Sequence, residues 1–382
     1  MYTVAHYGEM IADTVRMPCY EAALRRTVRP GSVVVDIGAG TGIFSLLACR
    51  LGLGARRVYA IEPAEVIHLA REIARTNGLA DRIEFIQGLS TGVTLPEPAD
   101  VVVADVRGAL PPFGKSLIAM MDARRRFLGP AGILIPQRDT LWAALVEMPD
   151  TYGRLVSPWS NPYEGIDMRA GRHSVVNAIH KASADSTQLI TAPQRWAAID
   201  YGSVESPDVQ GAFHAGCTRA GAVHGCLLWF TAMLAEGIEF CTGPGSKTIY
   251  GATFLPWPEP VAVRPGDEVS MELGAHLIGD DYLWVWNSRV REPGGQEKAA
   301  FAQSTFYGAP EFSPAALDRV APGRTPPLNP QGHAARAVLE LMDGERSLAE
   351  IAGQVLARFP REFPTPSAAM ALVTSLVRQF AP

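Results

Sequence analysis

The stretch VVVDIGAGTG, residues 33–42, decides the fold of the amino-terminal part of this chain. Three β-branched residues lead into Asp36, and glycines follow at positions 38, 40 and 42. β-Branched residues favour a buried strand, and glycines directly after a strand let a ligand approach the backbone without a Cβ in the way. The stretch therefore predicts a strand, a turn and a helix that bind a nucleotide-like ligand. The alternative is a turn that only allows close packing of the helix on the strand.

Two carboxylates beside this turn narrow the choice of ligand. Glu62 ends the next expected strand, about 20 residues on, where a carboxylate can accept hydrogen bonds from both ribose hydroxyls. Asp36 precedes the glycines and can accept from an ammonium. The GxGxxG spacing of dinucleotide sites is missing after Gly42. S-adenosylmethionine carries an adenosine at one end and an amino acid at the other. It is the ligand that the sequence predicts.

The pattern of apolar residues predicts the domains. Residues 1–140 alternate buried strands with helices and predict an α/β, Rossmann-like, doubly wound parallel sheet. Residues 141–310 contain short apolar strands separated by Gly, Pro and Asp turns, among them TIYGATFLPW (248–257), and predict a β-barrel-like domain. Residues 311–327 are proline-dense and predict a linker. Residues 328–382 return to helical spacing, with Ser347 and Glu350 as a capping box.

The composition restricts the partners. The formal net charge is −5, which gives no bulk attraction to nucleic acid or an anionic membrane. No apolar run is long enough to span a bilayer and no signal peptide is evident, so we expect a cytoplasmic protein. The 5 cysteines form no CxxC pair. Neither a disulfide framework nor a metal site is expected.

Several longer motifs carry a family resemblance. DxxRxxxY occurs at residues 13–20, VVVDIGAGTGIFSLLA at 33–48, and the acidic strand with its following helix at 61–88. LGPAGILIPQRDTLW (128–142) and the segments WSNPYEGIDM, LITAPQRWAAID and VHGCLLWF follow. Over about residues 5–310 the chain resembles the protein arginine methyltransferases, which are class I S-adenosylmethionine-dependent enzymes.

The resemblance implies a role for each part of the cofactor site. Arg16 would meet the methionine carboxylate, Glu62 the ribose, and residues 89–91 the adenine. A homodimer is also implied, formed through a barrel insertion that we place at residues 169–188. The residues expected to bind S-adenosylmethionine, or its product S-adenosylhomocysteine, are Met10, Arg16, Asp36, Gly38, Ala39, Gly40, Thr41, Gly42, Glu62, Pro63, Leu89, Ser90 and Thr91.

The residues that align with the family's substrate-binding loops differ from those of the family. The family's substrate loop carries two glutamates nine positions apart, and an alignment without gaps places Asp105 and Gly114 there. The family's Thr-His-Trp loop aligns with residues 248–250, so that Ile249 replaces the histidine. A planar guanidinium needs bidentate carboxylates, and each group left unpaired in a dry pocket costs about 1–3 kcal/mol. Methyl transfer to arginine is therefore not expected, whereas methyl transfer as such is.

Five residues are candidates for contact with the acceptor. Asp105 leaves a strand at the carboxyl edge of the sheet and is the expected catalytic residue, as a general base or by orienting the substrate. The alternative is a loop carboxylate that caps a turn. Tyr7, Arg107 and Tyr250 are expected to bind substrate. Arg107 could pair with Asp105 or meet an acidic substrate group, which keeps O-methylation open. Tyr250 could instead be a packed barrel residue. His6 is a second candidate base.

The carboxyl-terminal segment resembles a different family. LNPQGHAARAVLELMDGERSLAEIAGQVLARFP (328–360) is similar to the helical part of the small precursor-peptide-recognition domains of ribosomal peptide pathways. Such domains bind a leader peptide as an added strand. The strands that precede those helices are not evident here. The alternative is a helical cap on the methyltransferase.

Together these features leave three functions open. The first is a methyltransferase that acts on a nitrogen or oxygen of a peptide or protein side chain, with a ribosomal natural-product precursor as a candidate substrate. The second is a small-molecule methyltransferase. The third is a catalytically silent scaffold that binds a peptide through its tail.

Overall fold

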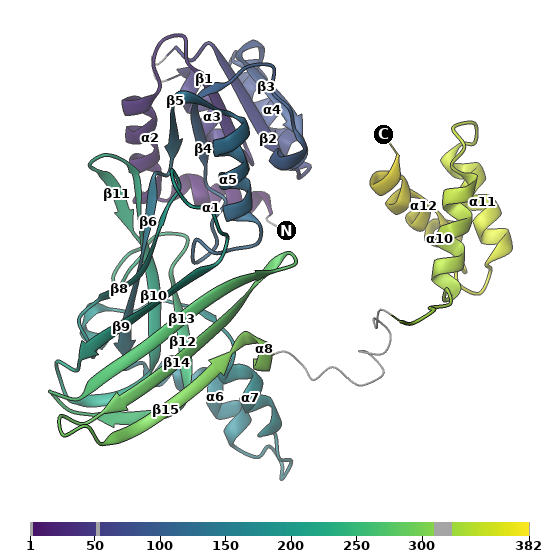
Figure 1. Cartoon of the computed structure of the whole chain (residues 1–382). Coiled ribbons are helices and arrows are strands. Elements are labelled where there is room, and N and C mark those ends of the chain that lie inside the picture. Colours follow the sequence, from purple (N-terminus) through teal and green to yellow (C-terminus); the bar gives the residue numbers. More distant parts are fainter. Residues whose placement is uncertain (1–2, 51–53, 309–322, 382) are drawn as a thin grey trace. The chain divides into compact units, whose positions relative to one another are not determined.

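The computed structural model describes residues 3–50, 54–308 and 323–381. The chain divides into two compact units, Met1–Pro310 and Glu311–Pro382. Most of the linker expected at residues 311–327 lies outside the described residues. The first unit combines a parallel sheet flanked by helices with a larger antiparallel region (Figure 1).

The amino-terminal half of the first unit is the predicted doubly wound sheet. Its five strands pair in parallel in the order β3-β2-β1-β4-β5. The strands are β1 (Val33–Ile37), β2 (Arg57–Glu62), β3 (Ile83–Gln87), β4 (Ala99–Ala104) and β5 (Leu128–Ile135). The helices are α1 (Val4–Ala12), α2 (Arg16–Thr27), α3 (Ile43–Arg50), α4 (Val66–Thr76) and α5 (Ser116–Arg126), with short turns η1 (Ala80–Arg82) and η2 (Ser90–Gly92).

The strand order fixes where a ligand can bind. All residues of β1 are buried, which its run of β-branched side chains explains. The order reverses direction between β1 and β4, so the loops that follow these two strands diverge. Such a switch point opens a crevice at the carboxyl ends of the strands. The glycine-rich turn and Asp105 both border this crevice.

The remainder of the first unit forms two antiparallel sheets. One runs β7-β12-β10-β6-β8, with β11 paired to β10, and the other runs β15-β14-β13-β9. The strands are β6 (Arg138–Val146), β7 (His180–Ala182), β8 (Gln194–Asp200), β9 (Val209–Gly216), β10 (Gly221–Ala235), β11 (Ile238–Cys241), β12 (Ala252–Val263), β13 (Glu268–Ile278), β14 (Asp281–Arg291) and β15 (Glu297–Ser304). The turn η3 (Ser186–Gln188) and the helix α8 (Thr305–Gly308) complete the unit.

Two details of this region differ from the sequence-based expectation. The strand expected over 248–257 begins only at Ala252, because the backbone groups of Ile249 bond outside the sheet, to Asp13 and Lys181. Two helices, α6 (Pro149–Ser160) and α7 (Ala170–Val176), interrupt the strands. They lie at the end of the antiparallel region away from the parallel sheet (Figure 1). A proline in the first turn of α6 favours its start, and this local signal was missed.

The second unit contains the three expected helices, α10 (Pro330–Leu341), α11 (Leu348–Arg358) and α12 (Pro366–Phe380). They share a small core that includes Val338, Ile351 and Val373. The capping box of Ser347 and Glu350 at the start of α11 is confirmed. Within residues 323–381 no strand is present.

Candidate cofactor and acceptor site

The crevice at the switch point holds a cavity of about 610 Å³. Helix α1, the turn after β1, the end of β2, η2, the loop after β4, β7 and the turn before β12 all contribute to it. A volume of this size suits a small-molecule ligand. It is lined by His6, Tyr7, Glu9, Met10, Ile11, Arg16, Ile37, Gly38, Ala39, Gly40, Thr41, Ile43, Phe44, Ile61, Glu62, Pro63, Gly88, Leu89, Ser90, Asp105, Val106, Arg107, Gly108, Ala109, Phe113, Gly114, Lys115, Ser116, Ala119, Lys181, Ile249 and Tyr250.

The glycine-rich turn forms one wall of this cavity, and two of its glycines leave no room for a side chain. Gly38 and Gly40 have φ angles of 69° and 54°. A Cβ on Gly38 would lie 2.7 Å from Val106 Cγ1, and a Cβ on Gly40 would lie 2.5 Å from Tyr7 Cε1. The turn therefore allows α1 to close over it. Gly42 does not line the cavity and instead faces Ala70, which makes it a packing residue.

We expect Gly40→Ala to weaken the binding of S-adenosylhomocysteine by at least about tenfold, or about 1.4 kcal/mol. The new methyl group would displace the Tyr7 ring and would strain the backbone at a positive φ. Isothermal titration calorimetry measures the effect. Gly8→Ala is the matched control, because Gly8 lies in α1 with open space around it. Equal affinities of the two variants would contradict this account of the turn.

Two carboxylates near the turn differ in their hydrogen-bond partners and in their access to the cavity. Glu62, at the end of β2, accepts hydrogen bonds from the Gly40 amide and the Ala64 amide, both at 2.9 Å, and lines the cavity. Asp36 is fully buried and accepts from the amide and hydroxyl of Ser45 with one oxygen. Its other oxygen accepts no hydrogen bond from the described residues. Asp36 does not line the cavity, so this buried acceptor would act on the ammonium group of an amino acid ligand through its charge and not by a direct hydrogen bond.

Burial raises the pKa of Asp36 to about 7, although the Ser45 hydrogen bonds act against it. A ligand ammonium would favour the ionised carboxylate and lower this pKa. Binding of S-adenosylhomocysteine at pH 6 should therefore release a proton, and its affinity should fall about tenfold for each pH unit below 7. Calorimetry in buffers of different ionisation enthalpy measures the release. Asp36→Asn should abolish it, and the absence of proton release from the unmodified protein would rule out this role.

Arg16, at the start of α2, lines the cavity and contacts Asp105 in the loop after β4. Asp13 caps the start of α2 by accepting from the amides of Val15 and Arg16, and so fixes where the arginine points. The Arg16 Nε donates to Asp105 at 2.5 Å and to the Tyr250 hydroxyl at 3.2 Å. One terminal nitrogen of the guanidinium donates to the Met10 carbonyl at 3.1 Å. The side chain is buried but lines the cavity.

Asp105 has partners for both of its oxygens. Besides Arg16, it accepts from Arg107 at 2.9 Å, and the Tyr250 hydroxyl lies 2.6 and 2.5 Å from its two oxygens. Burial alone would raise the pKa of Asp105, but the charges of Arg16 and Arg107 and the Tyr250 hydrogen bond outweigh it and hold the pKa below its usual range. The carboxylate is therefore a weak base, and neither oxygen is available to clamp a guanidinium.

Arg107 extends this network into the antiparallel sheets. Its Nε donates to Asp139 of β6 at 2.8 Å, and one terminal nitrogen donates to the Tyr20 hydroxyl at 3.0 Å. Asp139 also accepts from the Tyr201 hydroxyl at 2.6 Å. The second terminal nitrogen of Arg107 is buried without a partner among the described residues. Arg107 thus joins the loop after β4 to the barrel-like region and touches the cavity with only part of its side chain.

The cavity contains most of the residues expected from the sequence. Asp36, Gly42 and Thr91 are the expected cofactor residues that do not line it. Asp105, Tyr7, Arg107 and Tyr250 all do. The sequence-based reasoning missed the two lysines, Lys115 and Lys181, and the phenylalanines, Phe44 and Phe113. Lys181 reaches the cavity through the pairing of β7 with β12, which no local pattern reveals.

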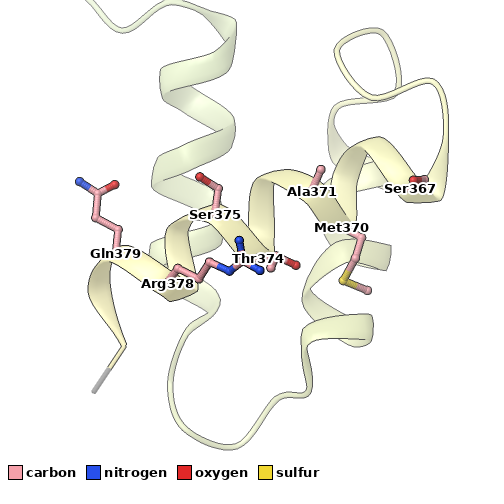
Figure 2. A pocket seen from close by; sticks show the side chains of 7 residues that line it. All are labelled: Ser367, Met370, Ala371, Thr374, Ser375, Arg378 and Gln379. Carbon is pink, nitrogen blue, oxygen red and sulfur yellow. The ribbon is translucent and has the colours of Figure 1, made fainter. Parts of the chain in front are cut away.

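A second hollow, of about 720 Å³, lies along α12 in the carboxyl-terminal unit (Figure 2). Its described lining comes from one face of this helix: Ser367, Met370, Ala371, Thr374, Ser375, Arg378 and Gln379. Arg378 is the only charged group among these seven side chains. The face has hydroxyls but no carboxylate, imidazole or thiol among these side chains, so it offers no general base to activate a hydroxyl nucleophile.

None of the helices in the described part of the chain is long and apolar enough to cross a membrane. No group of three or more His, Cys, Asp or Glu side chains in residues 3–50, 54–308 and 323–381 could hold a metal ion.

Family models match both halves of the first unit. Residues 14–140 match ribosomal protein L11 methyltransferase, and residues 137–277 match the arginine methyltransferase oligomerization subdomain. Among solved structures, the Trypanosoma brucei PRMT1 enzyme-prozyme heterotetrameric complex with AdoHcy aligns with a TM-score of 0.72 and 22% identity, covering 79% of this chain and 98% of that chain. This likeness supports the fold.

Sequence relatives identify the family. The chain is 31% identical over 258 residues to the probable protein arginine N-methyltransferase 6 of Arabidopsis thaliana, covering 64% of this chain and 57% of that protein. It is 30% identical over 259 residues to protein arginine N-methyltransferase 1 of Schizosaccharomyces pombe, covering 64% of this chain and 74% of that protein. The chain therefore belongs to the protein arginine N-methyltransferase family.

Proposed function

We propose that the protein transfers the methyl group of S-adenosylmethionine to a nitrogen or oxygen of a peptide or protein side chain other than arginine. Family membership and the cavity beside the glycine-rich turn support the methyl donor. When bound, the donor supplies an electrophilic methyl group on a positively charged sulfur. The backbone of the glycine-rich turn would contact the donor. Glu62 would bind its ribose, Leu89 and Ser90 its adenine, and Arg16 its carboxylate.

The acceptor part of the proposal rests on one observation, which is that the Asp105 carboxylate already has hydrogen-bond partners. Both oxygens of this carboxylate are engaged by Arg16, Arg107 and Tyr250. Gly114 and Ile249 stand where the family resemblance places a second glutamate and a histidine. A guanidinium entering beside Asp105 would meet two buried arginines, and like charges at close range repel strongly in a dry site.

Gly-Arg-rich and histone-like peptides are therefore expected to yield no detectable methylarginine. The test incubates the full-length protein with tritiated S-adenosylmethionine and such a peptide, followed by acid hydrolysis and amino acid analysis. Calorimetry with S-adenosylhomocysteine on the same preparation establishes that the cofactor site is intact. Methylarginine formed above the level of a control without the protein would contradict the proposal. No binding at high micromolar concentration would instead favour the silent scaffold.

The partners are part of the same proposal. A match to an oligomerization subdomain supports a homodimer, and α6 and α7 expose Tyr163, Ile166 and Met168 in the segment between them. The three-helix unit supports recognition of a peptide, with a ribosomal precursor as the candidate. Because strand addition needs a sheet edge and residues 323–381 contain none, such a peptide would bind this unit through helix faces.

A further inference from the structure

The acceptor side of the cavity carries more positive than negative charge. We define it as the lining residues from the loop after β4, from β7 and from the turn before β12. It contains one carboxylate, Asp105, and three cations, Arg107, Lys115 and Lys181. Two guanidiniums already compensate Asp105. A ligand on this side therefore meets a net positive potential.

Lys181 is the cation best placed to meet a ligand. Lys115 is paired with Asp280 at 2.5 Å. The ammonium of Lys181 instead donates to a neutral group, the Ile249 carbonyl, at 2.5 Å, and forms no ion pair within the described part of the chain. It lies at the rim, on an exposed side chain of β7. An ammonium with a neutral partner gains more from a carboxylate than one already in an ion pair.

The groups that could act as a general base are occupied or weak. His6 Nδ1 accepts from the Thr3 amide at 3.0 Å, which places the proton of the neutral ring on Nε2. Burial raises the pKa of Tyr250 well above its usual value, so its hydroxyl stays protonated. Glu62 accepts from two backbone amides. Glu9, exposed on α1, is the one other carboxylate among the described lining residues.

We propose that the acceptor is a carboxylate of a peptide, either a side chain of Asp or Glu or a free carboxyl terminus, bound by Lys181. This inference rests on the proposed function and names its substrate class. One carboxylate oxygen forms a bond to the methyl carbon while the carbon–sulfur bond breaks and its electron pair stays on sulfur. The products are a methyl ester and a neutral thioether, and no proton moves. A carboxylate is already ionised at neutral pH and needs no base.

Other acceptors fit the same surroundings less well. A lysine ammonium or a serine hydroxyl must lose a proton before or during attack, and the groups above do not supply a strong base. Cationic acceptors are also repelled by Arg107 and the two lysines. Phe113 and Ile249 add apolar surface to the cavity lining, against which the methylene groups of an acidic side chain could pack.

A binding experiment tests the role of Lys181 independently of turnover. Propionate and its neutral isostere propionamide are added to the full-length protein saturated with S-adenosylhomocysteine, and saturation-transfer NMR detects the bound ligand. We expect a signal for propionate that falls at least about fivefold in Lys181→Met, an effect of about 1 kcal/mol. Lys247→Met is the control, because Lys247 is exposed in a neighbouring loop outside the cavity lining. Equal signals from the two variants, or a stronger signal for propionamide, would overturn the assignment.

A labelling experiment identifies the acceptor. Three peptide libraries are incubated with tritiated S-adenosylmethionine: acidic side chains with amidated carboxyl termini, neutral side chains with free termini, and neutral side chains with amidated termini. We expect label in the first or second library, which distinguishes the two carboxylate sources, and release of that label as methanol in base. Base-stable label, label in the third library, or no label from a protein that binds S-adenosylhomocysteine would overturn the inference. Failure to bind S-adenosylhomocysteine would instead refute the proposed function.

Discussion

Replacement of Arg16 by methionine is expected to weaken the binding of S-adenosylhomocysteine by about 100-fold, or about 2.8 kcal/mol. The guanidinium lines the cavity, and its removal would eliminate charge-assisted hydrogen bonds to the ligand carboxylate. It would also leave Asp105 with one guanidinium neighbour in place of two. The ligand carboxylate would then approach a less compensated negative charge. The two effects act in the same direction.

Isothermal titration calorimetry measures this change, with Arg26→Met as the matched control. Arg26 lies on the same helix, α2, but is exposed and forms a long surface ion pair with Glu236. Surface pairs of this type contribute about 0–1 kcal/mol. An affinity of the Arg16 variant within about threefold of the unmodified protein, a difference of less than 1 kcal/mol, would show that Arg16 does not contact the ligand.

Replacement of Arg107 by methionine is expected to lower the free energy of unfolding by about 3–5 kcal/mol. Arg107 is buried between Asp105 and Asp139, and its removal leaves Asp139 with the Tyr201 hydroxyl as its remaining partner. Burial raises the pKa of Asp139, which shows how costly its charge is even with Arg107 present. Loss of the compensating cation should therefore destabilise the junction between the parallel sheet and the barrel-like region.

Urea denaturation followed by circular dichroism measures this effect. Arg138→Met is the control, because Arg138 precedes Asp139 in β6 but pairs with Asp200 at the surface. Its loss should cost at most about 1 kcal/mol. The double variant Arg107→Met/Asp139→Leu removes both charges and should be more stable than Arg107→Met alone. Equal destabilisation by Arg107→Met and Arg138→Met would contradict a structural role for the buried network.

Local sequence patterns were sufficient for the parallel sheet and for the turn. The β-branched run before Asp36 and the position of Glu62 at the end of a strand follow from neighbouring residues alone. The helices of the carboxyl-terminal unit can also be predicted from the sequence, because the caps at Ser347 and Thr365 lie directly before their first turns. In each case the deciding interactions lie within a few residues.

The acceptor side could not be predicted in the same way. The hydrogen bonds of Asp105 join it to Arg16 and Tyr250, which are 89 and 145 positions away in the sequence. Asp105 was therefore expected as a candidate base or orienting group, whereas its partners lower its basicity. Lys181 was missed because β7 is only three residues long and reaches the cavity through pairing with β12. Tertiary contacts, which leave no periodic pattern, determine the chemistry here.

The acceptor pocket changes what family membership means for this chain. Asp105 lies between two arginines, Arg16 and Arg107, and the family resemblance places no second carboxylate beside it. Under the proposed function, these positive charges would favour an anionic or neutral acceptor. The proposal therefore combines a donor site typical of the family with an altered acceptor site.

We propose that the donor site is intact while the arginine clamp is absent. A sequential calorimetric titration of the full-length protein tests both parts of this proposal, with S-adenosylhomocysteine added first and a Gly-Arg-rich peptide added to the same saturated sample. We predict saturable binding of S-adenosylhomocysteine and no further heat from the peptide. Failure of the first titration would contradict the donor site, and saturable binding of the peptide would contradict the altered acceptor site.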